Sequence, residues 1–382
     1  MGAWPCSLWA CALGDDMKRY ERQVLLPQIG TSGQLVINQS KVLIIGAGGL
    51  GSPAALYLAG AGVGTIGLVD GDIVELTNLQ RQIIYTEDQV GHSKVLAAKS
   101  KLISLNSELD IQIYPQDLDL ELALKIFSSY DVIIDGTDNF KAKFLINDVA
   151  LIYNLPVVYG AISGFEGQVS VFWKQQGPCY RCFYSKNPSA YIPNCAENGI
   201  MGAVAGTIGS VQAMEAIKLI LNKQNKKNSL EILIGKIFIL NLQNMQAMTL
   251  KLSKRPDCMC SHSAEHIQNA LRQTQTTLSI NDDCVLSKND ILPNQIPAYL
   301  NKENTFLLDF RNEIEWKNNP QESIQHVSYT DFMSGKIPDF IRPENTIILI
   351  CKSGLRSRKA SEFLKTKGFD NVLNVMGGIG KY

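Results

Sequence analysis

Four glycines near residue 50 form a loop that could bind a phosphate. Gly46, Gly48 and Gly51 follow a short apolar run in the pattern G-x-G-x-x-G, and Gly49 lies between them. Such a loop at the start of a helix presents backbone N–H groups and the positive end of the helix dipole to an anion. Asp70 follows nineteen residues after Gly51, where a carboxylate for a nucleotide ribose is expected. The pattern predicts a nucleotide site, with tight packing of a strand on a helix as the alternative.

Charged side chains after this loop favour ATP over NAD. A reaction at the α-phosphorus of ATP requires cations and a metal ion around the phosphates, whereas NAD carries one pyrophosphate that the loop can largely satisfy. A dehydrogenase would also need a proton donor, and His92 is the only histidine in the first 250 residues. The polar residues near the ends of the predicted strands are Asn78, Arg81, Lys94, Asp135 and Asp138. Their types suit a clamp for phosphates and Mg²⁺.

Seven motifs in residues 17–262 resemble the MoeB/ThiF/HesA family, whose members are related to ubiquitin-activating enzymes. In order they are RYERQ, GAGGLG, LVDGDIVELTNLQRQ, GHSKV, DGTDN, CYRC and CAENGI. The resemblance implies adenylylation of the C-terminal glycine of a small ubiquitin-like sulfur carrier that ends in Gly-Gly. The attacking group is then a carboxylate, which is ionised at neutral pH, so no general base is needed.

The resemblance also implies roles for the matching residues. Those implied to bind ATP are Gly46, Gly48, Gly49, Gly51, Asp70, Asn78, Arg81 and Lys94. Asp70 would hold the ribose, and Asp138 would hold Mg²⁺. Arg81 and Asp138 are the implied catalytic residues of this step. Arg22 would reach into the active site of a partner subunit, which implies a homodimer.

Four cysteines suit a structural zinc site. Cys179 and Cys182 form a Cys-x-x-Cys hook, and Cys258 and Cys260 follow later in the chain. Four thiolates favour tetrahedral Zn²⁺ in a closed site. The family has such a site with a second Cys-x-x-Cys, whereas only one residue separates Cys258 from Cys260. Three alternatives stay open: Cys260 still reaches the metal, His262 replaces it, or the site is degraded to free thiols.

Cys195 is a further cysteine with a possible reaction. It lies in the segment IPNCAENGI, which has the composition of a loop. In sulfur-transferring relatives the matching cysteine bonds covalently to the carrier, and this implies a catalytic role. A small packing residue is the alternative.

Cys351 opens a loop, CKSGLR, between a predicted buried strand and a helix. Backbone N–H groups of this loop, the helix dipole and the cations Lys352 and Arg356 would stabilise a thiolate, and equally a persulfide. The residues predicted to form the persulfide loop are Cys351, Lys352, Ser353, Gly354 and Arg356.

This loop resembles the six-residue active-site loop of rhodaneses. The segments LLDFRNEIEW and GFDNVLNVMGGI resemble other signatures of that domain, so the resemblance covers about 286–382. A protein phosphatase would favour Cys-x₅-Arg, whereas this loop has Cys-x₄-Arg. An inactive rhodanese-like module is the other alternative.

Composition limits the partners and the compartment. Thirty-six basic residues balance thirty-six acidic ones, so no overall charge attracts nucleic acid or an anionic membrane. The sequence has no run of eighteen apolar residues that would span a bilayer. Nine cysteines without a secretion signal favour a reducing compartment and a cytoplasmic enzyme.

Alternation of apolar strands and longer amphipathic segments predicts an α/β protein with two domains. Predicted strands at 41–46, 65–70, 131–136 and 155–160, a half-buried strand at 167–173 and helices at 88–105 and 202–221 favour a Rossmann-like, doubly wound and mainly parallel sheet. A smaller α/β rhodanese domain follows, with strands at 305–310 and 345–354 and a helix at 355–367. The predicted boundaries are 1–16 for a disordered extension, 17–262 for the first domain, 263–285 for a polar linker without a strong period, and 286–382 for the second.

These predictions combine into one reaction sequence. The first domain adenylylates the carrier with ATP and Mg²⁺, and a Cys351 persulfide, loaded by a cysteine desulfurase or another sulfur donor, converts the adenylate into a thiocarboxylate. An NAD-linked oxidoreductase with a fused sulfur-handling domain, and a non-catalytic protein that docks carrier and desulfurase, are the alternatives. The sequence leaves open whether the carrier serves molybdopterin, thiamine, tRNA thiolation or sulfur amino acids.

Overall fold

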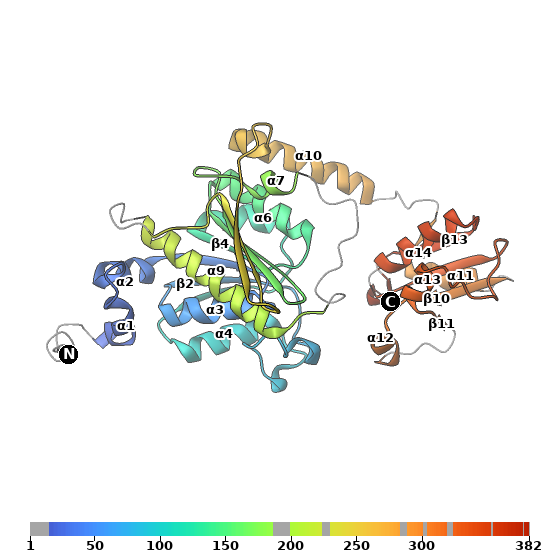
Figure 1. The fold of residues 1–382 in the computed structure, drawn as a ribbon, viewed down its shortest axis with the longest axis horizontal. Coiled ribbons are helices and arrows are strands. Elements are labelled where there is room, and N and C mark those ends of the chain that lie inside the picture. The colour runs from blue at the N-terminus through green and yellow to red at the C-terminus, as the bar shows by residue number, and fades with distance from the viewer. Residues whose placement is uncertain are drawn as a thin grey trace. The chain divides into compact units, whose positions relative to one another are not determined.

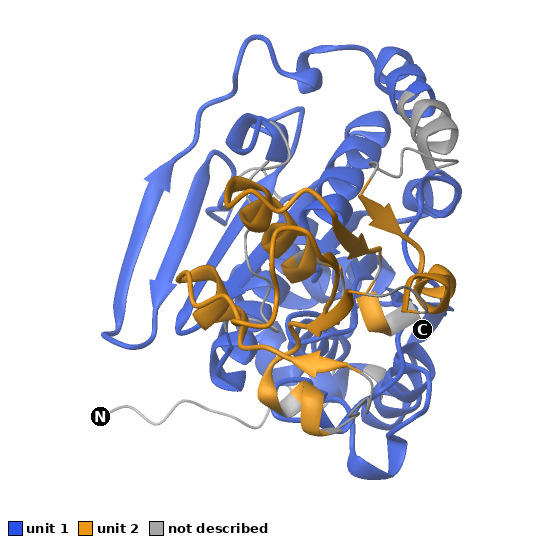
Figure 2. Ribbon diagram, turned by 90° about the vertical axis from the view of Figure 1, so that its right-hand side faces the viewer, with its two compact units in different colours: residues 1–274 blue, residues 275–382 orange. Residues whose placement is uncertain are grey.

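The chain forms two compact units, residues 1–274 and 275–382 (Figures 1 and 2). The computed structural model describes residues 15–185, 199–223, 230–282, 289–300, 304–318, 324–352, 354–376 and 378–381. Of the extension expected at 1–16, only Asp15 and Asp16 are described, and they begin a 3₁₀ helix, Asp15–Tyr20. Each unit has its own sheet and its own hydrophobic core.

The first unit is built on an eight-stranded sheet with the order β3-β2-β1-β4-β5-β6-β7-β8. The first five strands in this order pair in parallel and the rest antiparallel. The strands are β1 (Lys41–Ile45), β2 (Thr65–Val69), β3 (Asp110–Tyr114), β4 (Val132–Asp135), β5 (Val157–Ser163), β6 (Glu166–Phe172), β7 (Lys236–Asn241) and β8 (Gln246–Lys251). The doubly wound α/β prediction is confirmed, and β6 to β8 extend the parallel part.

Helices cover both faces of the parallel strands, as alternation along β1 shows. Val42 and Ile44 pack into the core beneath α3 (Gly51–Ala61), α4 (Lys94–Leu105) and α9 (Gly202–Asn222). Leu43 and Ile45 pack on the other face with α5 (Leu120–Ile126) and α6 (Phe140–Tyr153). Because successive strand residues point to opposite faces, the continuous apolar run KVLII is the pattern of a strand buried on both sides.

The remaining helices of this unit are α1 (Glu21–Val24), α2 (Gly30–Gln39), α7 (Tyr180–Phe183) and α10 (Ala264–Asp282). Helix α9 is long and apolar enough to cross a membrane by length and composition alone. Within the protein, however, 61% of its most apolar eighteen-residue window is buried, and it packs against α3 and β5. We therefore assign α9 to the core of the first unit.

Three segments differ from the prediction. Helix α4 begins at Lys94 instead of residue 88, because Glu87–Gln89 form a 3₁₀ turn and Gly91 adopts a positive φ of 88°. Strand β6 is mostly buried, not half-buried, since α9 and a cluster of aromatic rings cover its two faces. The polar stretch expected as a linker forms α10, whose buried Ile267 packs beside the four cysteines.

The second unit is a five-stranded parallel sheet with the order β11-β10-β12-β13-β9. Its strands are β9 (Asp290–Ile291), β10 (Thr305–Asp309), β11 (Gln325–His326), β12 (Thr346–Ile350) and β13 (Val372–Val375), and its helices are α11 (Ile296–Leu300), α12 (Glu313–Asn318), α13 (Tyr329–Met333) and α14 (Leu355–Thr366). Ile347 and Leu349 of β12 face one core, and Ile348 and Ile350 face another. The smaller α/β unit is thus present as predicted.

Candidate functional site

The glycine loop follows β1 and needs its glycines for steric reasons. Gly46 has a φ of 89°, which side chains disfavour. A Cβ on Gly51 would lie 1.9 Å from the Gly46 carbonyl oxygen. The backbone at the start of α3 therefore packs directly against the backbone of Gly46. Gly136, after β4, is equally close to Gly46, with 2.7 Å from its hypothetical Cβ to the same oxygen. The ends of β1 and β4 therefore meet without side chains between them, which leaves backbone groups available to a phosphate.

Asp70, at the end of β2, is tied to this loop. Its carboxylate accepts hydrogen bonds from the backbone N–H groups of Ala47 at 2.8 Å and of Asp72 at 2.9 Å. Burial raises the pKa of Asp70, and the charge of Lys94 and the two N–H groups oppose that rise. The carboxylate predicted to hold a ribose thus lies beside the loop predicted to hold phosphate.

Lys94 starts α4 and is almost fully buried, with a relative exposure of 5%. Its Nζ lies 2.7 Å from a carboxylate oxygen of Asp72, whose side chain is exposed. Burial of a lysine is costly unless the charge is paired, and Asp72 supplies the partner. Sequence analysis named Lys94 but missed Asp72, although the acidic residue stands in the same DGD motif as Asp70.

Asn78 and Arg81 are positioned by a 3₁₀ turn after β2. The Asn78 side chain accepts a hydrogen bond from the Glu75 backbone N–H at 3.2 Å, and the Asn78 carbonyl accepts one from the Arg81 N–H at 3.0 Å. The Arg81 guanidinium donates to the carbonyl oxygen of Thr77 at 3.0 Å. A Cβ on Gly49 would lie 3.6 Å from Cγ and Cδ of Arg81, so this arginine lies along the glycine loop.

Gln82 is a site residue that sequence analysis missed. It is only 4% exposed, and its Oε1 has no hydrogen-bond partner. A Cβ on Gly48 would lie 3.6 Å from the Gln82 amide nitrogen, which places this amide against the glycine loop. A buried polar atom without a partner is destabilising, so an unpaired amide beside the loop fits a polar ligand such as a nucleotide. Its position directly after Arg81 in NLQRQ was the available signal.

Two aspartates follow β4 and differ in environment. Asp135 is buried and accepts hydrogen bonds from the buried Lys143 at 3.0 Å and the Thr137 hydroxyl at 2.6 Å. Asp138 is exposed on the loop that Gly136 brings against Gly46. An exposed carboxylate beside a phosphate loop suits a hydrated Mg²⁺, whereas the paired Asp135 suits a structural role.

Arg22 is not brought to this group. It lies exposed on α1, and the hydrogen bonds and ion pairs of the described residues do not connect it to the glycine loop or to Asp70. Its predicted role in a partner subunit therefore stays a prediction.

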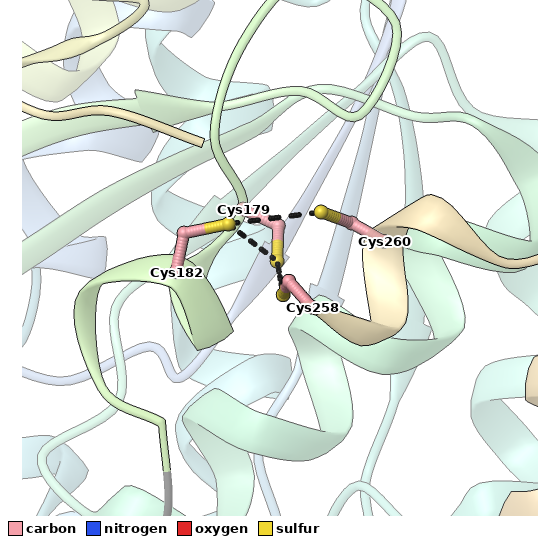
Figure 3. A group of neighbouring side chains, drawn as sticks. All are labelled: Cys179, Cys182, Cys258 and Cys260. Atoms are coloured by element: carbon pink, nitrogen blue, oxygen red, sulfur yellow. Dashed lines mark hydrogen bonds between the residues drawn. The ribbon is translucent and has the colours of Figure 1, made fainter. Parts of the chain in front are cut away.

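The four cysteines converge in one cluster (Figure 3). Their sulfur atoms all lie within 4.8 Å of one another, with 3.4 Å between Cys179 and Cys258 and 3.7 Å between Cys182 and Cys260. A tetrahedron of sulfurs about 2.3 Å from Zn²⁺ has edges of about 3.8 Å, so the donor set and spacing fit the ion. Cys260 therefore reaches the cluster despite the shortened spacing. His262 lies outside it, exposed, with its ring stacked on His266 at 4.5 Å.

Without a metal the thiols share protons. A hydrogen bond from Cys179 lowers the pKa of Cys258 to about 5, and the same hydrogen bond, with burial, raises the pKa of Cys179. Burial raises the pKa of Cys260 to about 12. The cluster therefore ionises readily at Cys258 and reluctantly at Cys179 and Cys260, and a bound cation would favour the thiolates.

The hook is anchored on α6. Arg181 makes two hydrogen bonds of 2.6 Å with the buried carboxylate of Asp148, and the Tyr180 backbone N–H donates to the Asn147 side chain at 2.8 Å. The Arg255 backbone N–H points at the Cys182 sulfur, at 3.4 Å. Such contacts around the ligands orient them before a metal binds.

Cys351 directly follows β12 and is fully buried. The Gly354 backbone N–H donates to its sulfur at 3.1 Å, and Gly354 adopts a φ of 83° as it caps α14. Gly378 closes the loop from behind, since a Cβ there would lie 2.2 Å from the Cys351 carbonyl oxygen. One N–H donor of the predicted loop is thus in place. Ser353 of this loop, and Cys195 of the first unit, lie outside the described residues.

The two cations of the loop differ in their surroundings. Arg356 donates to the Phe310 carbonyl oxygen at 2.9 Å and to Glu315 at 2.8 Å, so these hydrogen bonds tie α14 to the segment after β10. Lys352 is exposed. The predicted effect of Arg356 on the sulfur stays a prediction, and within the described residues its guanidinium donates to a carboxylate and to a carbonyl oxygen.

Comparison with known proteins gives matches to both units. Residues 20–261 match the ThiF family, and residues 292–382 match the rhodanese-like domain. The chain is 34% identical over 373 residues to the probable adenylyltransferase/sulfurtransferase MoeZ of Mycobacterium tuberculosis, which covers 96% of this chain and 92% of that protein. It is 35% identical over 372 residues to the probable molybdopterin-synthase adenylyltransferase of Porphyra purpurea, with 96% and 93% covered.

A similar solved structure is MccB of E. coli with MccA-N7isoASN, at a TM-score of 0.57 and 22% identity. It covers 65% of this chain and 76% of that one. At this identity the likeness concerns the fold of the first unit alone.

Proposed function

Because this chain belongs to the ThiF family and also carries a rhodanese-like domain, we propose that it is an adenylyltransferase and sulfurtransferase of a ubiquitin-like sulfur carrier protein. The observation that carries this proposal is the convergence of the glycine loop, Asp70 and Arg81 at the carboxyl ends of β1 and β2. Ligands of open α/β sheets bind at this edge. The family match, rather than this geometry, separates the proposal from the NAD-linked alternative.

In the first step the C-terminal carboxylate of the carrier attacks the α-phosphorus of ATP, and pyrophosphate leaves. Arg81, Asn78 and Lys94 would contact the phosphates, the backbone of the glycine loop would add N–H donors, and Asp138 would hold Mg²⁺. The main task of these groups is to bring two anions together and to stabilise charge at the transferring phosphorus. Lys94 enters this task already desolvated and paired with Asp72, so its orientation is set before the nucleotide binds.

In the second step Cys351 supplies sulfur. Its thiolate attacks the outer sulfur of a donor persulfide, the donor thiolate leaves, and Cys351 carries the persulfide. That persulfide attacks the carbonyl carbon of the acyl-adenylate, AMP leaves, and an acyl disulfide forms. A second thiolate, for which we propose Cys195, attacks the Cys351 sulfur and releases the thiocarboxylate. An external dithiol then reduces the disulfide between Cys351 and Cys195.

The proposal extends to cofactors, assembly and domains. The cysteine cluster would hold a structural Zn²⁺, Arg22 would complete the site of a partner subunit in a homodimer, and the enzyme would act in the cytoplasm. Residues 17–262 would form the adenylyltransferase domain and 286–382 the rhodanese domain. The name of the Porphyra purpurea relative makes a carrier of molybdopterin synthase the first to test, before carriers of thiamine, tRNA thiolation and sulfur-amino-acid routes.

Intact mass spectrometry tests the two steps. Each candidate carrier ending in Gly-Gly is incubated with the enzyme, Mg·ATP, a cysteine desulfurase and cysteine, and the expected product has one oxygen replaced by sulfur. Cys351→Ala should still release pyrophosphate but leave the carrier oxygen in place. Arg81→Ala should load a persulfide on Cys351 but release no pyrophosphate, so each variant is the control for the other. Exchange of oxygen for sulfur by Cys351→Ala at the wild-type rate would remove the rhodanese step.

A further inference from the structure

A chain of buried hydrogen bonds leads from Asp290 to Cys351 in the second unit. Asn374 donates from Nδ2 to Asp290 at 2.8 Å, Ser357 donates from Oγ to Asn374 Oδ1 at 2.7 Å, and the Ser357 oxygen lies 3.5 Å from the Cys351 sulfur. Ser357 and Cys351 are fully buried and Asn374 is 2% exposed. The four residues come from β9, β13, α14 and the end of β12, so the chain spans the sheet behind the active-site loop.

The partners at the far end fix the direction of every hydrogen bond. A carboxylate only accepts, and Asp290 also accepts from Arg358 at 3.1 Å, so the Asn374 amide must turn its nitrogen toward Asp290. The Asn374 carbonyl oxygen then faces Ser357. A serine hydroxyl has one proton, and Ser357 donates that proton to Asn374.

This direction determines what Ser357 offers to Cys351. With its proton committed to Asn374, the Ser357 oxygen presents only lone pairs to the sulfur. The contact of 3.5 Å is therefore a hydrogen bond only if Cys351 is a thiol that donates its S–H to Ser357. A thiolate in the same arrangement would meet lone pairs, and its one described donor would be the Gly354 N–H.

We propose that Asp290 and Asn374 are positioning residues that hold the Ser357 hydroxyl turned away from the Cys351 sulfur, so that Cys351 rests as a thiol and ionises only when this hydroxyl turns. On ionisation the thiol proton goes to water, the Ser357 O–H turns to the thiolate, and Asn374 loses its donor. The inference rests on the proposed role of Cys351 in sulfur transfer. Its consequence is a sulfur that is less open to oxidation between loading events, because the thiolate is the reactive form.

Other charges surround the loop and bear on the ionisation of Cys351. The charged and titratable groups on the packed elements include Lys352, Arg356 with Glu315, Asp309 with Arg311, His326, and Asp290 with Arg358. Within this set the ion pairs join their partners at 2.8 to 3.1 Å, and Lys352 is exposed. The test must therefore separate the direction of one hydroxyl from a general change of charge.

The measurement is the rate of alkylation of Cys351 by iodoacetamide as a function of pH, in the full chain and resolved by peptide mass spectrometry. In Asn374→Val the Ser357 hydroxyl is released and should donate to the thiolate, so alkylation at neutral pH should be on the order of tenfold faster than wild type. The double variant Ser357→Ala/Asn374→Val should not gain over Ser357→Ala alone. Circular dichroism checks that each variant is folded.

Asp290→Asn keeps the shape of the side chain but replaces the carboxylate with an amide, which can both donate and accept a hydrogen bond. The Asn374 amide can then face residue 290 with either its nitrogen or its oxygen. Asp290→Asn should therefore speed alkylation in the same direction as Asn374→Val. Arg358→Gln is the matched control for charge, and it should leave the rate near wild type because the amide orientation persists. Equal and opposite changes of the alkylation rate in Asp290→Asn and Arg358→Gln would show that charge alone sets the rate, and would overturn the proposal.

A folded Asn374→Val variant that reacts at the wild-type rate or more slowly would also overturn the proposal, as would a gain that persists without Ser357. The assay uses neither carrier nor ATP. A failure of carrier thiolation with the alkylation results as expected would therefore count against the proposed function alone. Carrier thiolation with unchanged alkylation in Asn374→Val would count against the hydrogen-bond chain alone.

Discussion

At the scale of single residues, the candidate nucleotide site combines a partly exposed cation, Arg81, with a buried cation, Lys94, that an ion pair holds in place. Arg81 lies along Gly49 and donates to the Thr77 carbonyl oxygen, a partner that a phosphate oxygen can replace. Lys94 is buried and paired with Asp72, so its charge is already in place and its side chain does not have to move when a ligand binds. We therefore expect different tasks for the two cations, with Arg81 acting on the charge that develops in the transition state and Lys94 on the phosphates of the bound nucleotide.

Arg81→Ala should fold like wild type and lose carrier-dependent exchange of pyrophosphate into ATP by roughly 10³–10⁵-fold, the usual loss for an arginine that stabilises phosphoryl charge. Arg81 is partly exposed, and its one described side-chain hydrogen bond goes to Thr77, so little stability should be lost. Lys101→Ala, which removes an exposed cation of α4, is the control and should exchange normally. Normal exchange by Arg81→Ala would take this residue out of the mechanism.

Residues whose chemical type restricts their function could be identified from the sequence. Residues whose importance depends on being buried in the folded structure could not. Asp70, Arg81 and the four cysteines were predicted because their types and spacing restrict the chemistry. The motif NLQRQ places Gln82 beside Arg81, but its residue type alone does not mark it, since its significance is a buried amide oxygen without a partner. Ser357 likewise matters through the direction of one proton, and that direction is fixed by Asp290, far away in the sequence.

At the scale of elements, two segments bring the cysteine cluster together. Cys179 and Cys182 flank the start of α7, and Cys260 lies in a 3₁₀ turn, Met259–Ser261, that follows Cys258. The tight turn brings both sulfurs of the Cys-x-Cys pair toward the hook, which explains why one intervening residue is enough. Ile267 of α10 packs on the cluster, so the closure also positions that helix.

Cys260→Ser should lower the zinc content of the purified protein well below one ion per chain and lower the melting temperature of the first unit by about 10 °C, because structural metal binding is folding free energy. A strong chelator should shift the wild-type melting temperature in the same direction and have little further effect on the variant. Ser261→Ala, an exposed neighbour, is the control. Zinc content equal to wild type in Cys260→Ser would contradict a four-cysteine site.

Elements with a single buried face were harder to predict than those buried all round. The runs that became β1 and α9 are mostly apolar and were placed within one or two residues. In α10 Ile267 and Leu271 pack against the cysteine cluster, and most of the other residues are polar. The segment was therefore predicted to be a linker. The start of α4 depends on the positive φ of Gly91, a backbone state that the residue type permits but does not require.

At the scale of the whole molecule, each unit has its own hydrophobic core. The clusters that hold β10 and β12 contain only residues after 290, and those of the first sheet contain only residues before 272. Units that share no core residues are expected to unfold as separate cooperative transitions.

Calorimetry should therefore resolve two transitions. Mg·ATP should raise the melting temperature of the first unit and leave that of the second unchanged, because a ligand stabilises only the unit that binds it. Phe332→Ala removes a fully buried ring of the second unit. It should lower only the melting temperature of that unit, because its free energy of unfolding falls by about 3–5 kcal/mol. Val95→Ala, in the core of the first unit, is the matched variant. One transition that moves as a whole in both variants would contradict independent units.

The spacing of the cysteine ligands has a consequence for biosynthesis. Cys179 is translated long before Cys258 and Cys260, and all eight strands of the first sheet precede the second pair in the chain. A nascent chain whose residue 260 has not yet left the ribosome exit tunnel carries Cys179 and Cys182 without the pair that completes the cluster. Closure of the cluster would then act as a late checkpoint in synthesis, reached only after every strand of the sheet has left the ribosome.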